Sequence, residues 1–323
     1  MTIPTSSENE SLHRDGGEIP GSGGQPAFSL TRRLPSPVPV LVSVPHAGRA
    51  YPHALLERMR HPVFASLKLE DRFVDRLAEA IAQATGAALL VAHAPRAMVD
   101  LNRAEDDVDW EMIGGGAPDD LGSYAPGHRA RSGLGLIPRR LPGLGEVWKR
   151  RHERGELAAR IADIHRPYHA CLAQTLGELR DRWGAALLID LHSMPPLASR
   201  GGQPTPHFVI GDRFGASCHG GLVATTFAQL AERGRLASHN RPYAGGYVLE
   251  RHAAPHRGIH AMQIEIDRSC YLDSRLTIPG PGFARMVADL IDLVSRLAGE
   301  VASMGCPDTG RGDATESWPE AAE

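Results

Sequence analysis

Residues 185–195 read AALLIDLHSMP, an uncharged apolar run that ends among polar side chains. A run of this kind is typical of a strand that is buried on both faces, as in a parallel sheet. Asp190, His192 and Ser193 come at its carboxyl end, which is the edge where open α/β sheets bind ligands. His192 is therefore a candidate site residue, although a single histidine in such a place is more often structural.

Strand and helix patterns alternate along the rest of the chain. Short apolar runs predict further strands at 39–44, 87–92, 98–101, 207–211 and 259–267. Apolar residues at helical spacing predict helices at 67–84, 157–183, 222–233 and 283–298. Pro167 is expected to kink or restart the second of these helices. The alternation predicts an α/β fold with a mixed, largely parallel sheet flanked by helices.

We expect one catalytic domain over residues 36–304. Residues 1–35 and 305–323 contain many small and polar residues and few large apolar ones, so both are predicted to be disordered tails. Residues 104–145 are rich in Gly, Pro, Arg and Asp and show no periodicity. A loop of this length inside a compact domain is usually functional, often as a lid.

Composition narrows the class of protein. The 323 residues include 35 basic and 38 acidic side chains, and the formal net charge of -3 argues against a general nucleic-acid binder. The 4 cysteines show no CxxC spacing, which indicates neither a disulfide framework nor a cysteine-rich zinc site. No apolar run approaches the roughly 20 residues of a membrane span, and the first residues lack a signal-peptide core. We expect a cytoplasmic protein with no membrane or nucleic-acid partner; the sequence does not indicate its oligomeric state.

Histidines after two strands suggest a metal centre. His46 comes two residues after the predicted strand 39–44, and His192 lies at the end of its own strand. Imidazole is the commonest ligand for catalytic zinc, which needs three protein ligands and one open position. Candidates for the third ligand are Glu70, Asp71 and Asp75, although acidic residues at a helix start also favour the helix dipole.

Arginines and a carboxylate could complete an active site. Arg96, Asn102 and Arg103 flank the predicted strand 98–101, and arginine binds carboxylates through two parallel hydrogen bonds. Surface ion pairs with Asp100, Glu105 or Asp106 are an equally good explanation of these arginines. Glu265 alternates with apolar neighbours on strand 259–267, which makes it the best candidate for a general base. A buried salt bridge to an arginine such as Arg268 is the alternative.

The remaining motifs do not indicate a second metal site or another type of catalysis. His165 and His169 have the i, i+4 spacing of a helical metal pair, but they lack the glutamate of a HExxH motif and have Pro167 between them. We expect a structural or supporting role for this pair. The sequence contains no P-loop, no GxGxxG after a strand and no GxSxG elbow, so nucleotide binding and serine-hydrolase chemistry lack support.

Taken together, eight short motifs resemble the N-formylglutamate amidohydrolase family. In the family's order they are SVPHAGRAYP (43–52), EDRFVDRL (70–77), RAMVDLNR (96–103), RPYH (166–169), IDLHSMP (189–195), NRPYAGGY (240–247), RH (251–252) and HAMQIEIDRSCY (260–271). The resemblance implies a zinc hydrolase that cleaves N-formyl-L-glutamate to formate and L-glutamate in histidine degradation. It also implies a fold like that of zinc carboxypeptidases and aspartoacylase.

Residue by residue, the resemblance implies particular roles. One zinc ion, or another divalent metal, would be held by His46 and His192. Glu265 would be the base and Arg96 a second catalytic residue. Asn102 and Arg103 would clamp the carboxylate of a small-molecule substrate, and Gly246 and His252 would also belong to the substrate site. The chain departs from the relatives' His-x-x-Glu pair, because the position three after His46 is Arg49. Asp71 is then the predicted third ligand.

Two alternative functions follow from the same residues. A carboxylate clamp does not recognise a formyl group, so the substrate could be another N-acyl amino acid or a related amide. The loop arginines Arg129, Arg131, Arg139 and Arg140 are expected to influence that choice. The presence of Arg49 in a ligand's place also permits a metal-free binding protein on a hydrolase scaffold. A binuclear manganese ureohydrolase needs several clustered aspartates, and IDLHSMP supplies only Asp190.

Overall fold

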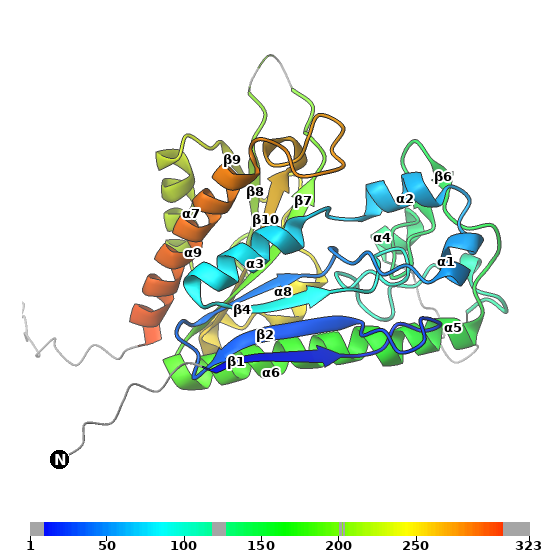
Figure 1. Ribbon diagram of the computed structural model, residues 1–323, viewed down its shortest axis with the longest axis horizontal. Coiled ribbons are helices and arrows are strands. Elements are labelled where there is room, and N and C mark those ends of the chain that lie inside the picture. The colour runs from blue at the N-terminus through cyan, green and yellow to red at the C-terminus, as the bar shows by residue number, and fades with distance from the viewer. Residues whose placement is uncertain (1–9, 118–126, 200–201, 203, 306–323) are drawn as a thin grey trace, which may run out of the picture.

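The computed structural model describes residues 10–117, 127–199, 202 and 204–305. An eight-stranded sheet forms its centre, in the order β1-β2-β4-β3-β7-β10-β8-β9 (Figure 1). The strands are β1 (Glu10–Gly16), β2 (Phe28–Leu34), β3 (Val40–Val44), β4 (Ala88–Ala92), β7 (Ala186–Met194), β8 (Phe208–Gly211), β9 (Ala237–His239) and β10 (Ile259–Asp267). The four central strands are parallel to one another, while β2 and β8 join them antiparallel. The predicted mixed, largely parallel sheet is confirmed.

Helices cover both faces of the sheet. They are α1 (His53–Arg58), α2 (Pro62–Leu69), α3 (Val74–Thr85), α4 (His128–Arg131), α5 (Arg154–Arg160), α6 (Arg166–Trp183), α7 (Gly220–Glu232), α8 (Tyr247–His252) and α9 (Phe283–Gly305). Short 3₁₀ helices span Trp110–Met112, Pro255–Arg257 and Arg268–Cys270, and β5 (Arg140–Leu141) pairs with β6 (Gly145–Glu146). Among the described residues, none of the helices combines the length and the apolar character that a membrane span requires.

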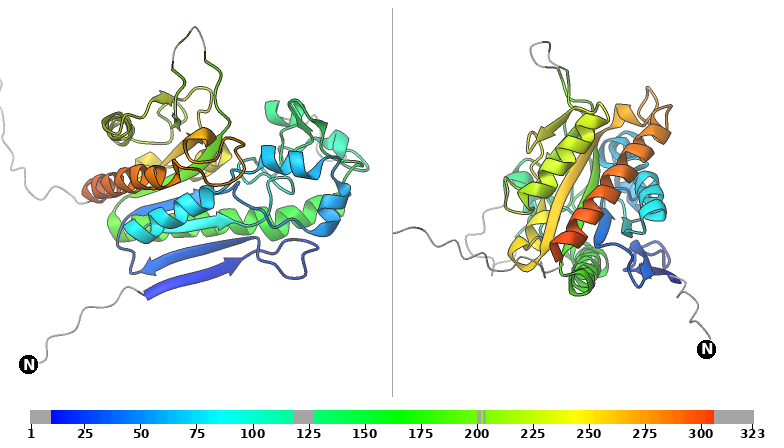
Figure 2. Two further views of the ribbon diagram at one scale, coloured as in Figure 1. Left: turned by 45° about the horizontal axis from the view of Figure 1, so that its top comes forward. Right: turned by 90° about the vertical axis from the view of Figure 1, so that its left-hand side faces the viewer.

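Alternate strand residues face two separate apolar layers. Leu41 and Leu188 belong to the layer with α6, whereas Val42 and Leu187 belong to the layer with α3, α7 and α9. Figure 2 shows the helices around the sheet from two further directions. Because side chains alternate along a strand, Ser43, Asp190 and Glu265 share the α6 face with Leu41 and Leu188. The α6 face is therefore apolar at one end and polar toward the carboxyl ends of the strands.

The long helical segment behind the sheet contains an irregular turn. The chain runs from α5 through a π-helical turn at Ile161–His165 into α6, and Pro167 lies in the first turn of α6. Pro167 has no N–H to donate, so the regular hydrogen-bond pattern cannot run through it unchanged. The predicted restart near Pro167 is thus observed as a change of helix type.

Two expectations about local structure are wrong. The predicted helix 67–84 is divided into α2 and α3 around residues 70–73, where Phe73 adopts a left-handed conformation with φ 59°. The predicted strand 98–101 is a turn, because the Asp100 carboxylate accepts a hydrogen bond from the Asn102 main chain at 2.9 Å. Both departures lie beside the candidate site.

The expected N-terminal tail also needs correction. Within residues 1–35, β1 and β2 form an antiparallel hairpin along the lower edge of Figure 1, and β2 pairs with β4. Ile19, Phe28 and Leu30 are buried, and Phe28 packs edge-on against Tyr168 with ring centroids 5.6 Å apart. Composition does not reveal main-chain pairing with a distant strand. The expected C-terminal tail begins at Gly305, which instead ends α9, and residues 306–323 lie outside the described residues.

The sheet order creates a ligand-binding position. From β3 the chain moves to β4 on one side, and later returns to β7 on the other side of β3. The connections therefore diverge between β3 and β7, and such a switch point opens a crevice at the carboxyl ends of the strands. His46 and His192 lie at these two strand ends.

Candidate active site

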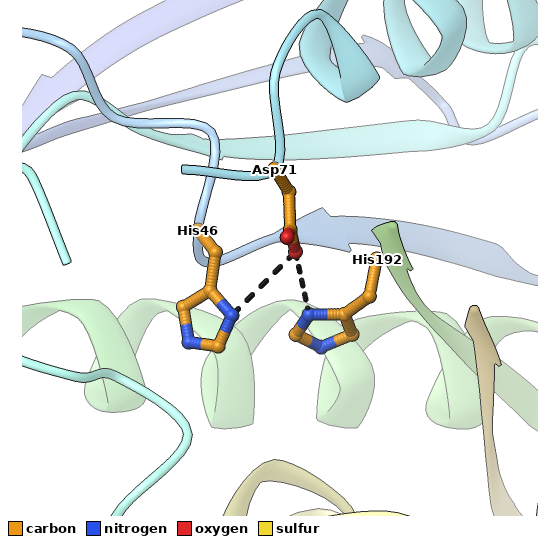
Figure 3. A group of neighbouring side chains, drawn as sticks. All are labelled: His46, Asp71 and His192. Atoms are coloured by element: carbon orange, nitrogen blue, oxygen red, sulfur yellow. Dashed lines mark hydrogen bonds and ion pairs between the residues drawn. The ribbon is translucent and has the colours of Figure 1, made fainter. Parts of the chain in front are cut away.

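Three buried side chains meet at the switch point. Nδ1 of His192 lies 3.0 Å from the Asp71 carboxylate, and Nδ1 of His46 lies 3.5 Å from the same oxygen (Figure 3). The candidate ligand atoms of the three residues all lie within 4.8 Å of one another. His46 follows β3, His192 is in β7, and Asp71 lies in the break between α2 and α3. The predicted trio is therefore assembled from three segments that are distant in sequence.

Two further aspartates orient the histidine rings. His46 Nε2 lies 2.7 Å from Asp100, and His192 Nε2 lies 2.8 Å from Asp190. Ser43 donates to Asp190 at 2.6 Å and fixes that carboxylate in turn. A carboxylate on one ring nitrogen directs the other nitrogen at a metal and strengthens it as a ligand. Both Nδ1 atoms consequently face Asp71.

The acidic residues near Asp71 have other partners. Glu70 forms an ion pair with Arg72 at 2.7 Å, and Asp75 accepts hydrogen bonds from the two terminal guanidinium nitrogens of Arg49, one of them at 3.1 Å. Arg49 is thus paired with Asp75. Of the three acidic candidates, Asp71 alone faces His46 and His192.

The electrostatic environment favours a positive charge between these groups. Burial alone would raise the pKa of Asp71, but hydrogen bonds from His192 and His46 hold the pKa below its usual value. Burial would lower the pKa of His192, yet Asp190 and Asp71 raise it well above the usual value. Buried carboxylates therefore surround the two imidazoles, an arrangement that a proton or a metal cation would stabilise.

A cavity of about 830 Å³ opens over this cluster. It is lined by the three clustered residues and by five of the other predicted site residues: Arg96, Asn102, Arg103, Gly246 and Glu265. His252 is absent from the lining and instead lies 2.9 Å from His169. The prediction that His252 touches substrate therefore lacks support from the cavity.

Glu265 is buried beside the cluster. It pairs in register with His192 across β10 and β7, and it is 8% exposed. Burial raises its pKa to about 7, and the charge of Asp71 raises it as well, while His192 lowers it. Gln263 donates to its carboxylate at 3.0 Å. A carboxylate with a pKa near neutrality is suited to accept and return a proton.

The two predicted clamp residues lie in a turn that hydrogen bonds join to two other segments. The Asn102 side-chain oxygen accepts from the main chain of Val248 at 2.9 Å, and Arg103 donates to the carbonyl of Leu134 at 3.0 Å. A Cβ at Gly246 would come within 2.4 Å of the Asn102 side chain. Gly246 therefore acts by allowing this close approach. Arg96 donates to Asp100 at 2.9 Å at the cavity wall.

Sequence reasoning missed the orienting aspartates Asp100 and Asp190. A signal for Asp190 was present, because residues two apart on a strand share a face, and Asp190 precedes His192 by two. Asp100 gave no comparable signal, since its neighbours were expected to form a strand. The role of Arg268 was partly foreseen: it pairs with Asp71 at 3.2 Å instead of with Glu265.

Fold and site together define an α/β protein with a buried His-Asp-His cluster, a neighbouring glutamate and arginines around one cavity. Comparison with known proteins gives the family. Residues 38–272 match the family model described as N-formylglutamate amidohydrolase. The chain belongs to this family.

Relatives of known name agree with this assignment. The N-formylglutamate deformylase of Pseudomonas aeruginosa is 31% identical over 252 residues, covering 74% of this chain and 84% of the relative. That of Pseudomonas putida is 31% identical over 241 residues, covering 73% and 82%. The crystal structure of N-formylglutamate amidohydrolase from Ralstonia eutropha JMP134 has 32% sequence identity and a TM-score of 0.78, covering 86% of this chain and 99% of that one.

Proposed function

We propose that the protein is a zinc-dependent amidohydrolase that cleaves N-formyl-L-glutamate to formate and L-glutamate. The observation that carries this proposal is the convergence of His46, Asp71 and His192 beneath a cavity that Glu265 and arginines also line. Relatives named N-formylglutamate deformylase, at 31% identity, support the choice of substrate. The cytoplasmic location and the role in histidine degradation remain predictions of the sequence.

The donor set fits a zinc ion. Two imidazole nitrogens and one carboxylate oxygen form the three-ligand set of many catalytic zinc sites, and they leave a position for water or substrate. If Nε2 of each ring donates to Asp100 or Asp190, both Nδ1 lone pairs face the Asp71 carboxylate. Acceptors that converge in this way repel one another unless a cation lies between them. A bound zinc ion would supply Lewis-acid chemistry, polarising the formyl carbonyl and making water more acidic.

Glu265 would transfer a proton from water to the leaving amine. It accepts a proton from water as the water oxygen bonds to the formyl carbon, and it returns that proton to the amine nitrogen as the C–N bond breaks. The products are then formate and glutamate. Arg96, whose guanidinium is fixed by Asp100, lies at the cavity wall and would stabilise negative charge on the carbonyl oxygen.

Cationic groups in the cavity suit a dicarboxylate substrate. Arg103 and Asn102 would hold the α-carboxylate, as the family resemblance implies. Of the four arginines expected to influence substrate choice, only Arg129 lines the cavity. Arg139 pairs with Asp109 and Glu111, and Arg140 pairs with Glu146. Arg129 is therefore the group that we assign to the side-chain carboxylate of glutamate.

Formate release from N-formylglutamate tests the proposal. Purified protein should release formate, a chelator should abolish the release, and added zinc should restore it. N-acetylglutamate assayed in parallel distinguishes a deformylase from a broader acylase. Formate release that is insensitive to chelation would contradict the metal role, and turnover of N-acetylglutamate alone would contradict the substrate assignment.

A further inference from the structure

Behind the carboxylate clamp lies a cluster of buried histidines to which the catalytic proposal gives no role. His165 and His169 come from one helical segment, and His252 ends α8. All three are buried, and none of them lines the cavity. They cannot touch substrate, so any functional role must act through a neighbouring group.

Two of these histidines form hydrogen bonds with the main chain that carries the clamp residues. His169 Nε2 donates to the carbonyl of Leu101 at 3.0 Å, and His165 Nε2 donates to the carbonyl of Arg103 at 2.8 Å. The carbonyl between them, that of Asn102, accepts from the Arg103 guanidinium at 2.7 Å. Three successive carbonyls are thus bound by side chains, which fixes the orientation of residues 101–103.

His252 determines how His169 presents its proton. Its Nε2 lies 2.9 Å from His169 Nδ1, and the two rings stack with centroids 5.2 Å apart. Because Leu101 offers only an acceptor, Nε2 of His169 must carry a proton. Burial lowers the pKa of both rings, so both are neutral at pH 7, and His169 Nδ1 is then an acceptor. His252 must donate to it, and this selects the tautomer of His169 that binds Leu101.

The surroundings support a functional purpose for the cluster. The π-helical turn Ile161–His165 ends at His165, and such turns are frequent at functional sites. Tyr247, which lines the cavity, packs on His165 and His169 with centroid distances of 5.9 Å and 5.2 Å. The histidines therefore support the clamp from behind, on the side away from the cavity.

We propose that His165 and His169, with His252 behind them, are positioning residues that hold residues 101–103 so that Asn102 and Arg103 meet the substrate's α-carboxylate. This inference rests on the proposed function, because it takes the clamp to bind a carboxylate. It gives the cluster a role in substrate affinity and none in the bond-breaking step.

Single variants test this in the zinc-loaded protein. His165→Ala and His169→Ala should each raise KM for N-formylglutamate and Kd for L-glutamate about five- to tenfold, the effect of one lost hydrogen bond. The value of kcat and the zinc content should stay close to wild type. His165→Gln and His169→Gln should restore near-normal affinity, because the glutamine amide can donate where Nε2 did.

A buried histidine outside the cluster provides the matched control. His260 is 4% exposed and packs toward His219, so His260→Ala should alter neither KM nor Kd. Unchanged glutamate affinity in His165→Ala and His169→Ala would overturn the inference, as would an equal loss in His260→Ala or a failure of both glutamine variants to restore affinity. A wild-type protein that does not hydrolyse N-formylglutamate would refute the proposed function, whereas wild-type turnover with unaltered variant affinities would refute only the positioning role.

Discussion

At the scale of single residues, three carboxylates lie within six positions, from the end of α2 to the first turn of α3, and their partners distinguish them. Glu70 is neutralised by Arg72 and Asp75 by Arg49, whereas Asp71 faces two imidazoles. Asp71→Asn should therefore reduce zinc affinity by more than about 100-fold, since even residues that merely support a ligand contribute 10- to 100-fold. Zinc content after dialysis measures this.

The neighbouring carboxylate supplies the control for that measurement. Asp75→Asn breaks the pair with Arg49, which is 31% exposed at its side chain, and should leave zinc content unchanged. Full zinc occupancy in Asp71→Asn would exclude Asp71 as a ligand. Arg49 itself provides no reason to expect a metal-free protein, because the chain supplies a carboxylate from another segment to the place that Arg49 does not fill.

A substitution of Glu265 should affect catalysis without affecting metal binding. Glu265→Gln keeps the shape and the hydrogen bond from Gln263 but cannot accept a proton. We expect kcat to fall by about 10²- to 10⁴-fold while zinc content stays constant. Stopped assays of formate release together with metal analysis check both values, and a variant with normal turnover would remove Glu265 from the mechanism.

Arg129 tests how the cavity recognises a second carboxylate. No carboxylate of the described residues lies within ion-pair distance of its guanidinium, although the group lines the cavity. Arg129→Gln should raise KM for N-formylglutamate about five- to tenfold and leave KM for N-formylnorvaline, which lacks the side-chain carboxylate, unchanged. Arg140→Gln, at a paired arginine outside the cavity, is the matched control. Equal effects on both substrates would contradict the assignment.

At the scale of elements, the buried central strands could be predicted, whereas the outer strands β1 and β2 and the breaks between elements could not. The strands that carry His192 and Glu265 follow from apolar runs, because burial on two faces demands such runs. The division between α2 and α3 was hidden, since Leu69, Phe73 and Leu77 keep a spacing of four through it. That break brings Asp71 to the histidines. The turn at 98–103 was likewise hidden, because the side chain of Asp100 shapes it.

The N-terminal hairpin, which was expected to be a disordered tail, can be tested through its contribution to stability. Phe28 on β2 is 2% exposed and contacts Tyr168 of α6, so Phe28→Ala should destabilise the fold by about 3–5 kcal/mol. Phe64 on α2 is 64% exposed, and Phe64→Ala should change stability by less than about 0.5 kcal/mol. Urea unfolding measures both. A negligible effect of Phe28→Ala would show that residues 10–34 do not contribute to the stability of the fold.

At the scale of the whole molecule, one face of the sheet packs the core and the other also carries the candidate site. Its α3 and α9 face is mainly apolar, whereas its α6 face changes from apolar packing to a row of polar side chains beneath the cavity. Holding carboxylates and histidines in such a buried row costs free energy, because each group loses hydration. The fold offsets that cost by pairing the groups with one another, so the stability of the molecule must depend on pH.

His252 allows one part of that dependence to be isolated. Burial, the positive charge of Arg251 and the neighbouring His165 together lower its pKa to about 4, although Asp190 opposes them. The unfolded chain takes up a proton here near pH 6.5, but the folded chain does so only near pH 4. Between these values the unfolded state binds more protons, and stability falls as the pH falls.

Replacement by glutamine removes the titration and keeps a donor toward His169. Between pH 7 and pH 5, wild-type protein should therefore lose about 2 kcal/mol more of its free energy of unfolding than His252→Gln does. Urea unfolding of both proteins at the two pH values gives this difference, and contributions from other titrating groups cancel in it. Parallel losses in the two proteins would show that His252 takes up its proton equally well in the folded and unfolded chains.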